Sequence, residues 1–73
     1  MQFKRIRDLR EDRDLFQKDL AKLLSISQAQ YSRIETGENE ITLDSLIRLS
    51  KFYDVSVDYI LNLTDEKKIY PRK

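Results

Sequence analysis

The sequence contains no cysteine, no histidine and no tryptophan, and it has one glycine and one proline. Without cysteine it can form no disulfide and holds no thiol nucleophile, and without histidine it can form no Ser-His-Asp triad or zinc site of the usual kind. A single glycine also rules out a glycine-rich phosphate loop. Carboxylates are numerous, but no set of catalytic groups accompanies them. We therefore expect no enzymatic activity, no metal and no cofactor.

A chain of 73 residues is long enough for one domain. We expect this domain over residues 1–64, followed by a flexible basic tail over residues 65–73. The tail serves solubility or acts as an arm that adds phosphate contacts. No apolar run approaches the length of a signal peptide or a membrane span. The sequence therefore predicts a cytoplasmic protein with no membrane contact, and no small-molecule ligand is evident.

Apolar residues recur at helical spacing along the chain, and no stretch alternates long enough to predict a strand. We expect helices over residues 2–13, 17–24, 28–36 and 43–53, and a short fifth helix after Ser56. Ser27 and Thr42 are suitable N-caps for the third and fourth helices. Leu46, Leu49 (or Ile47) and Phe52 are expected to face inward from the fourth. The fold class predicted is all-α, a compact bundle of five helices.

Charge is distributed unevenly, although the net charge is only +1. Residues 16–36 hold three basic and two acidic side chains, whereas residues 37–64 hold two basic and five acidic ones. The tail from residue 65 holds four basic and two acidic side chains. A surface that faces a polyanion must therefore lie away from the acidic stretch.

The third expected helix has an inner face and a polar outer face. Tyr31, Ile34 and Glu35 share one side at i, i+3 and i+4 spacing, and Ala29 and Arg33 lie on the other. Solvated helix faces usually carry Glu and Lys, whereas this one carries Gln, Ala, Ser, Arg and Thr. Gln can form two hydrogen bonds with adenine, Arg with guanine, and Ala or Thr can touch the thymine methyl.

Residues 17–36 resemble the helix-turn-helix of the lambdoid phage repressor and Cro family, the Cro/CI or xenobiotic-response-element family. The resemblance extends over about residues 3–63, through the closing pair of helices around residues 46–61. It implies a bundle in which the third helix lies in the major groove of DNA. The matching positions are Gln17, Leu20, Ala21, Leu24, Ile26, Tyr31 and Ile34.

The resemblance implies which residues touch DNA. Bases would be contacted by Gln28, Ala29 and Arg33, with Ser32 and Thr36 nearby. Gln17 would hold a phosphate at the start of the second helix, and Gln30 would either contact phosphate or complete a Ser27-x-x-Gln30 capping box. In the loop after the third helix, where Glu38 and Glu40 are acidic, main-chain N–H groups or polar side chains would approach the backbone. The candidate phosphate contacts are Gln17, Gln30, Asn39 and Thr42.

Three further features follow from the resemblance. The family commonly pairs a first-helix arginine with the glutamate at position 35, so we expect a partly buried ion pair between Arg10 and Glu35. Position 16 is Phe where the family usually has a capping Ser or Thr, so Phe16 either packs locally or is an exposed partner surface. The loss of that cap at position 16 costs the second helix about 1 kcal/mol. Position 25 is Ser where older members have Gly.

The function implied is sequence-specific binding of a double-stranded DNA operator by a transcriptional regulator, most simply a repressor. One recognition helix reads only a few base pairs, so we expect a homodimer on a two-fold symmetric site. The residues Tyr53, Tyr59, Ile60 and Leu63 are either core or an exposed apolar dimer surface. The alternative is a protein-interaction module, such as an antitoxin or anti-repressor partner. A large exposed patch formed by Phe16 and the C-terminal apolar residues would favour it.

Overall fold

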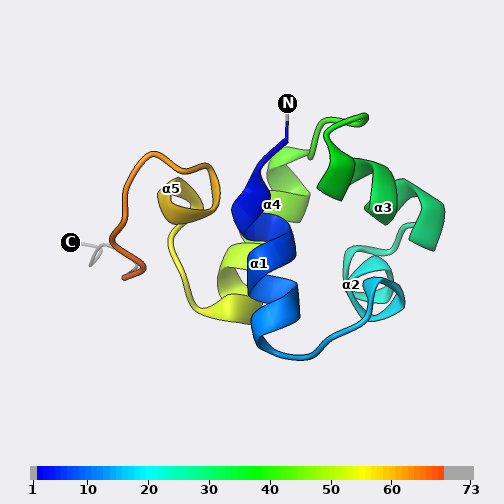
Figure 1. Ribbon diagram of the computed structural model, residues 1–73, viewed down its shortest axis with the longest axis horizontal. Helices are drawn as coiled ribbons and strands as arrows, with labels where there is room; N and C mark the ends of the chain where they lie inside the picture. The colour runs from blue at the N-terminus through cyan, green and yellow to red at the C-terminus, as the bar shows by residue number, and fades with distance from the viewer. Residues whose placement is uncertain (1, 69–73) are drawn as a thin grey trace.

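The computed structural model describes residues 2–68, and this part of the chain folds into five α-helices with no strand (Figure 1). The predicted all-α bundle is therefore confirmed. The helices are α1 (Lys4–Asp12), α2 (Gln17–Leu24), α3 (Gln28–Thr36), α4 (Leu43–Tyr53) and α5 (Val57–Ile60).

The helices enclose a single core. Figure 1 shows α1 and α4 in the middle of the molecule, α2 and α3 on one side and α5 on the other. The α3 helix packs on α2 and α1, and α5 packs on α4 and α1, so α1 joins the two sides. The buried apolar residues come from the helices and, for Val55, from the turn between α4 and α5: Ile6, Leu9, Leu20, Ala21, Leu24, Tyr31, Ile34, Leu46, Leu49, Tyr53, Val55 and Ile60.

The first helix begins later than the sequence predicts. Phe3 has an extended backbone, with φ −104° and ψ 96°, and its partly buried ring packs against the core. Gln2 turns toward α3, where its side-chain amide donates a hydrogen bond to the main-chain carbonyl of Glu35. Residues 2 and 3 therefore make tertiary contacts, and the expected start of the helix at residue 2 is wrong.

The fourth helix has the expected limits but a different inner face. Leu46, Leu49 and Tyr53 are buried at i, i+3 and i+7, whereas Phe52 and Ile47 are each 40% exposed. The prediction that Phe52 or Ile47 faces inward is wrong, because Tyr53 occupies the last core position of the stripe. The Phe52 ring instead meets the Tyr53 ring edge-on, with 5.0 Å between centroids.

Helices α2 and α3 both end at a residue in the left-handed region. Gly37, after α3, has φ +86°, as the sequence predicts for this glycine. A Cβ atom added to Gly37 would lie 2.8 Å from the main-chain nitrogen of Gln2, so the chain also approaches closely here. Ser25, after α2, has φ +57°, a conformation that strains a residue with a side chain.

The segment after α5 returns along the molecule. Arg5 donates hydrogen bonds to the carbonyls of Tyr59 and Thr64 and pairs with Asp65, while its guanidinium lies 4.0 Å from the centre of the Tyr59 ring. The Ser56 N–H donates to the carbonyl of Lys67 at 2.8 Å. Residues 64–67 are thus tied to α1 and α5. Residues 69–73 of the expected tail lie outside the described residues.

Candidate nucleic-acid interface

The α3 helix presents two chemically different faces. Tyr31, Ile34 and Glu35 are buried, at 0%, 8% and 4% exposure. Ser32, one of the expected base contacts, is half-buried. The other residues expected to contact bases and the candidate at position 30 are exposed, and together they form the outer face of α3: Gln28, Ala29, Gln30, Arg33 and Thr36.

The start of α3 is fixed by a reciprocal pair of hydrogen bonds. The Gln30 N–H donates to Ser27 Oγ at 3.1 Å, and the Ser27 N–H donates to Gln30 Oε1 at 2.9 Å. This arrangement is the capping box that the sequence left open as one role of Gln30. With Oε1 occupied, the Nε2 amino group is the part of this side chain that remains able to donate to a phosphate.

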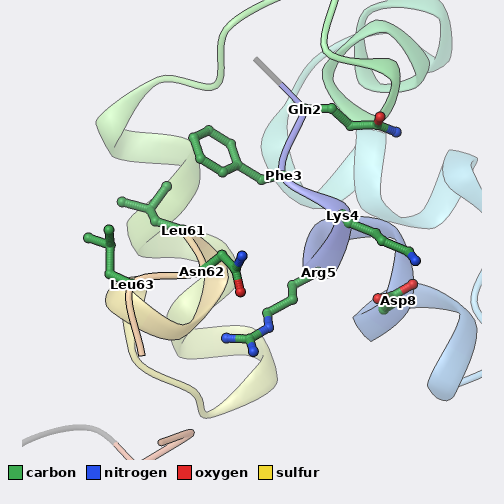
Figure 2. A pocket seen from close by; sticks show the side chains of 8 residues that line it. All are labelled: Gln2, Phe3, Lys4, Arg5, Asp8, Leu61, Asn62 and Leu63. Atoms are coloured by element: carbon green, nitrogen blue, oxygen red, sulfur yellow. The ribbon is translucent and has the colours of Figure 1, made fainter. Parts of the chain in front are cut away.

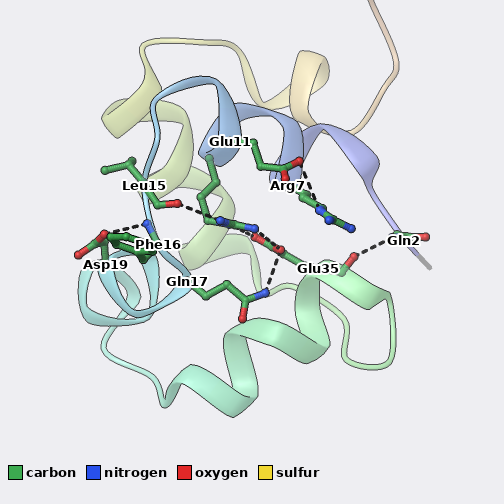
Figure 3. A network of polar contacts seen from close by, with 9 residues as sticks. Gln2, Arg7, Glu11, Leu15, Phe16, Gln17, Asp19 and Glu35 are labelled. Carbon is green, nitrogen blue, oxygen red and sulfur yellow. Dashed lines mark hydrogen bonds and ion pairs between the residues drawn. The ribbon is translucent and has the colours of Figure 1, made fainter.

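The rest of α3 is held in place by a polar network around Glu35 (Figure 3). Arg10 Nε donates to Glu35 Oε2 at 2.7 Å and Arg10 Nη2 donates to Glu35 Oε1 at 3.2 Å, so the ion pair is bidentate. Gln17 Nε2 adds a bond to Oε1 at 3.1 Å, and Gln2 Nε2 donates to the Glu35 carbonyl at 3.0 Å. The network ties α3 to α1, α2 and the N-terminal segment.

The charge state of this network follows from its contacts. Burial, the largest single influence, raises the pKa of Glu35, but the hydrogen bonds from its neighbouring donors, Arg10 above all, together with the positive charge of Arg10 outweigh it and hold that pKa below its ordinary value. The hydrogen bond to Glu35 correspondingly raises the pKa of Arg10. Burial also raises the pKa of Tyr31, and it raises the pKa of Tyr53 to about 12. At neutral pH the pair is therefore fully charged.

The expected phosphate contacts differ in how their polar groups are already engaged. Gln17 is half-buried and uses its amide on Glu35. Asn39 is exposed, and its main-chain N–H donates to the Arg33 carbonyl at 3.1 Å, so a phosphate contact at this position would use the side-chain amide. Thr42 is exposed, and its Oγ1 caps α4 by accepting the Ser45 N–H at 3.1 Å.

Arg33, the cation of the outer face of α3, forms only a weak ion pair. Arg33 Nε lies 3.9 Å from a carboxylate oxygen of Glu38, and both side chains are more than half exposed. A pair this long and this exposed contributes little to stability. The guanidinium is therefore available to another acceptor.

Sequence reasoning missed the role of Gln2 in this site. Its hydrogen bond satisfies one of the last carbonyls of α3, which has no partner within the helix. No pattern along the chain identifies this contact, because it joins residues 33 positions apart.

The backbone order of α2, its turn and α3, together with a separate outer face on α3, is that of a helix-turn-helix. The family model described as "Helix-turn-helix" matches residues 6–60. The chain belongs to this helix-turn-helix family. Its resemblance to the Cro/CI type is confirmed by relatives that include a phage repressor.

Three relatives of this helix-turn-helix chain illustrate how similar it is to known transcriptional regulators. It is 41% identical over 66 residues to the uncharacterized HTH-type transcriptional regulator YobD of Bacillus subtilis, with 90% of this chain and 59% of YobD covered. It is 32% identical to the HTH-type transcriptional regulator ImmR of the same organism, with 89% and 51% covered. It is 36% identical to the cryptic phage CTXphi transcriptional repressor RstR of Vibrio cholerae, with 73% and 48% covered.

These three relatives are longer than the helix-turn-helix chain, which spans from about half to three fifths of their length. No solved structure matches this chain. Among the described residues, no helix is long and apolar enough to cross a bilayer.

The C-terminal apolar residues divide between core and surface. Tyr53 and Ile60 are buried, Tyr59 is half-buried and Leu63 is 73% exposed. Leu63 borders a pocket of about 560 Å³ between the start of α1 and the end of α5 (Figure 2). Figure 2 shows Phe3 and Leu61 on its apolar side and Arg5 beside them.

Proposed function

We propose that this helix-turn-helix chain binds double-stranded DNA sequence-specifically and regulates transcription as a repressor. The observation that carries the proposal is the outer face of α3, which is exposed over its length while the inner face is buried. Arg33, Gln28 and Ala29 have the side chains that read guanine, adenine and the thymine methyl. Relatives named as transcriptional regulators, and RstR as a repressor, support the same role.

Rigid seating of α3 supports the proposal as well. The capping box fixes the start of the helix, and the Glu35 network fixes its end from three neighbouring segments. A helix that is already ordered loses little conformational freedom on entering a groove. Phosphate contacts from Gln17, Gln30, Asn39 and Thr42 would set the position of α3 on the duplex, and base contacts would set its sequence preference.

Selection of bound sites from random duplexes at physiological salt tests the proposal. We expect a consensus with two symmetric halves. In Arg33→Ala, discrimination should fall at one base pair per half, by about 1–3 kcal/mol, whereas Lys22→Ala, which removes an exposed cation of α2 outside the outer face of α3, should leave the base preference unchanged. Failure of the unaltered chain to bind any duplex at low salt would refute it.

We infer further that the regulator acts as a homodimer on a two-fold symmetric operator in the cytoplasm. The pocket beside Leu63 supports this, because it combines a protruding apolar side chain with an apolar hollow, as a self-complementary surface requires. The two half-sites should then lie about one helical turn apart, roughly 34–36 Å. Leu63→Glu should abolish the symmetric footprint while retaining the fold, and a footprint of unchanged length and affinity would contradict the inference.

The interaction-module alternative gains no support from the surface. Phe16 and Leu63 are both exposed, but they border different hollows at opposite ends of α1. They do not form the single large patch that this alternative requires.

A further inference from the structure

We propose that Phe16 is itself a DNA contact, in which its ring packs on a deoxyribose of the backbone while the neighbouring Lys18 pairs with a phosphate. This inference rests on the proposed DNA binding and adds a residue to it. It also accounts for a large apolar side chain that the fold does not use.

Phe16 has no structural role that requires its ring. It precedes α2 with an extended backbone, and its side chain is 66% exposed, outside the core. The ring makes no capping hydrogen bond, and the contact at this helix start comes from the Phe16 main chain, whose N–H donates to the Asp19 carboxylate at 2.9 Å (Figure 3). Leu15, the neighbouring apolar residue, is the one packed against the core. The exposed ring is therefore not explained by folding.

The ring stands between two hollows of opposite charge. The hollow toward α3, of about 430 Å³, is lined by Gln17, Lys18, Gln28, Arg10 and the ring itself, with no carboxylate. The hollow on the other side, of about 400 Å³, is also bordered by Arg10, but it has the carboxylates of Glu11 and Asp14 in place of Lys18. A polyanion is therefore attracted to the α3 side of the ring and repelled from the other.

Lys18 supplies the charge on the favoured side. Its ammonium lies 5.5 Å from the centre of the Phe16 ring, and the side chain is exposed. The charge of Arg10 is already matched by Glu35. Ring and ammonium thus present an apolar surface and a free cation side by side, which matches the alternation of sugar and phosphate along a DNA strand.

The hollow adjoins the face proposed to read bases. Gln28, the first residue of α3, lines the same hollow as Phe16 and Lys18. When Gln28 reaches a base edge, the strand that borders the major groove passes the start of α2. A protein partner would not require this adjacency, so the duplex backbone is the occupant that the geometry favours.

Substitution tests the contact. In Phe16→Ala the affinity for every duplex should fall by about fivefold, with base preference unchanged, since sugar contacts carry no sequence information. The slope of log K against log salt should remain constant because no charge is lost, whereas in Lys18→Ala it should fall by about one. The matched control is Phe52→Ala, which removes another exposed ring beside a cation, Arg13.

A fluorescent reporter tests it directly. Since the chain has four tyrosines but no tryptophan, Phe16→Trp places a single tryptophan, which can be excited selectively, at the proposed contact, and Phe52→Trp places one away from it. We expect saturating duplex to quench emission and to shield it from acrylamide only in Phe16→Trp. Circular dichroism and melting should show both variants folded, since both sites are exposed.

The outcomes separate the two proposals. If the unaltered chain binds duplexes, measured by anisotropy of labelled DNA, while Phe16→Ala binds equally well and Phe16→Trp emission is unchanged, the Phe16 contact is overturned and DNA binding stands. Emission that shifts with protein concentration alone also overturns it, since the ring then lies in a protein interface. If the unaltered chain binds no duplex, the proposed function itself fails.

Discussion

Glu35→Ala should strongly destabilise the chain. The carboxylate is 4% exposed and accepts two hydrogen bonds from Arg10 and one from Gln17. Removing it leaves the Arg10 guanidinium, whose side chain is 13% exposed, without its anion. Breaking a buried pair by deleting one partner costs about 3–5 kcal/mol.

This cost is large compared with the stability of so small a domain. A chain of 73 residues is expected to have a free energy of unfolding of about 4–11 kcal/mol. Because 1 kcal/mol shifts the midpoint of a domain this size by about 4–8 °C, Glu35→Ala should lower it by more than about 10 °C. The assay is urea and thermal unfolding at pH 7, followed by circular dichroism.

Two further variants show where the loss comes from. Glu11→Ala removes an exposed ion pair to Arg7, at 3.3 Å, and should change stability by less than about 1 kcal/mol. Arg10→Met combined with Glu35→Leu removes both charges and should recover much of the loss. A Glu35→Ala midpoint equal to that of the unaltered chain would refute the reasoning, and so would equal losses in Glu35→Ala and Glu11→Ala.

The same pair predicts how stability depends on pH. Although burial raises the pKa of Glu35, the hydrogen bonds from its neighbours and the charge of Arg10 together hold it below 4.5, its ordinary value, so the unfolded chain takes up this proton more readily than the folded one. The contribution of the pair is therefore complete above about pH 4.5 and is lost as the pH falls through the folded pKa. Acid titration should destabilise the unaltered chain more steeply than Glu35→Ala in this range.

Three other substitutions give independent tests. Ser25→Gly should stabilise the fold by about 0.5–1 kcal/mol in urea unfolding, because Ser25 has φ +57°; a lower stability would show that its side chain contributes more than its strain costs. Gly37→Ala should destabilise it by more than about 1 kcal/mol, because φ is +86° and the added Cβ meets Gln2 at 2.8 Å; an unchanged melting temperature would contradict this. Glu38→Gln should tighten binding to all duplexes at low salt, because it removes the ionic partner of Arg33 and a negative charge near the DNA backbone. The gain in affinity should be smaller when Arg33 is also replaced by Ala. Equal affinities of Glu38→Gln and the unaltered chain would show that Glu38 does not compete with DNA for Arg33.

The sequence predicted the helices well where local signals agree. Ser27, Gln30 and Gly37 identify the limits of α3, because capping depends on neighbours in the chain. The inner position of Glu35 followed from helical spacing, and its pairing with Arg10 from the family resemblance. These features needed no knowledge of tertiary packing.

The sequence predicted less where two core solutions compete. Phe52 and Tyr53 are adjacent aromatic residues, and a shift of one position decides which is buried. Tyr53, seven residues after Leu46, is the buried one, and Phe52 is not. Helical spacing allows either residue to face inward, so only the placement of the neighbouring helices decides between them. Gln2 and Arg5 likewise depend on segments 33 to 60 residues away.

The residues that hold α3 and those proposed to read DNA are separate sets, and this separation has a consequence for specificity. Tyr31, Ile34 and Glu35 supply the packing and the ion pair, whereas Ala29 and Arg33 are exposed. Substitutions at the exposed positions leave the core and the Glu35 network untouched, so their effects on stability should stay within about 0.5 kcal/mol. Base preference can therefore change by substitution on the outer face of α3 without loss of the fold that positions it.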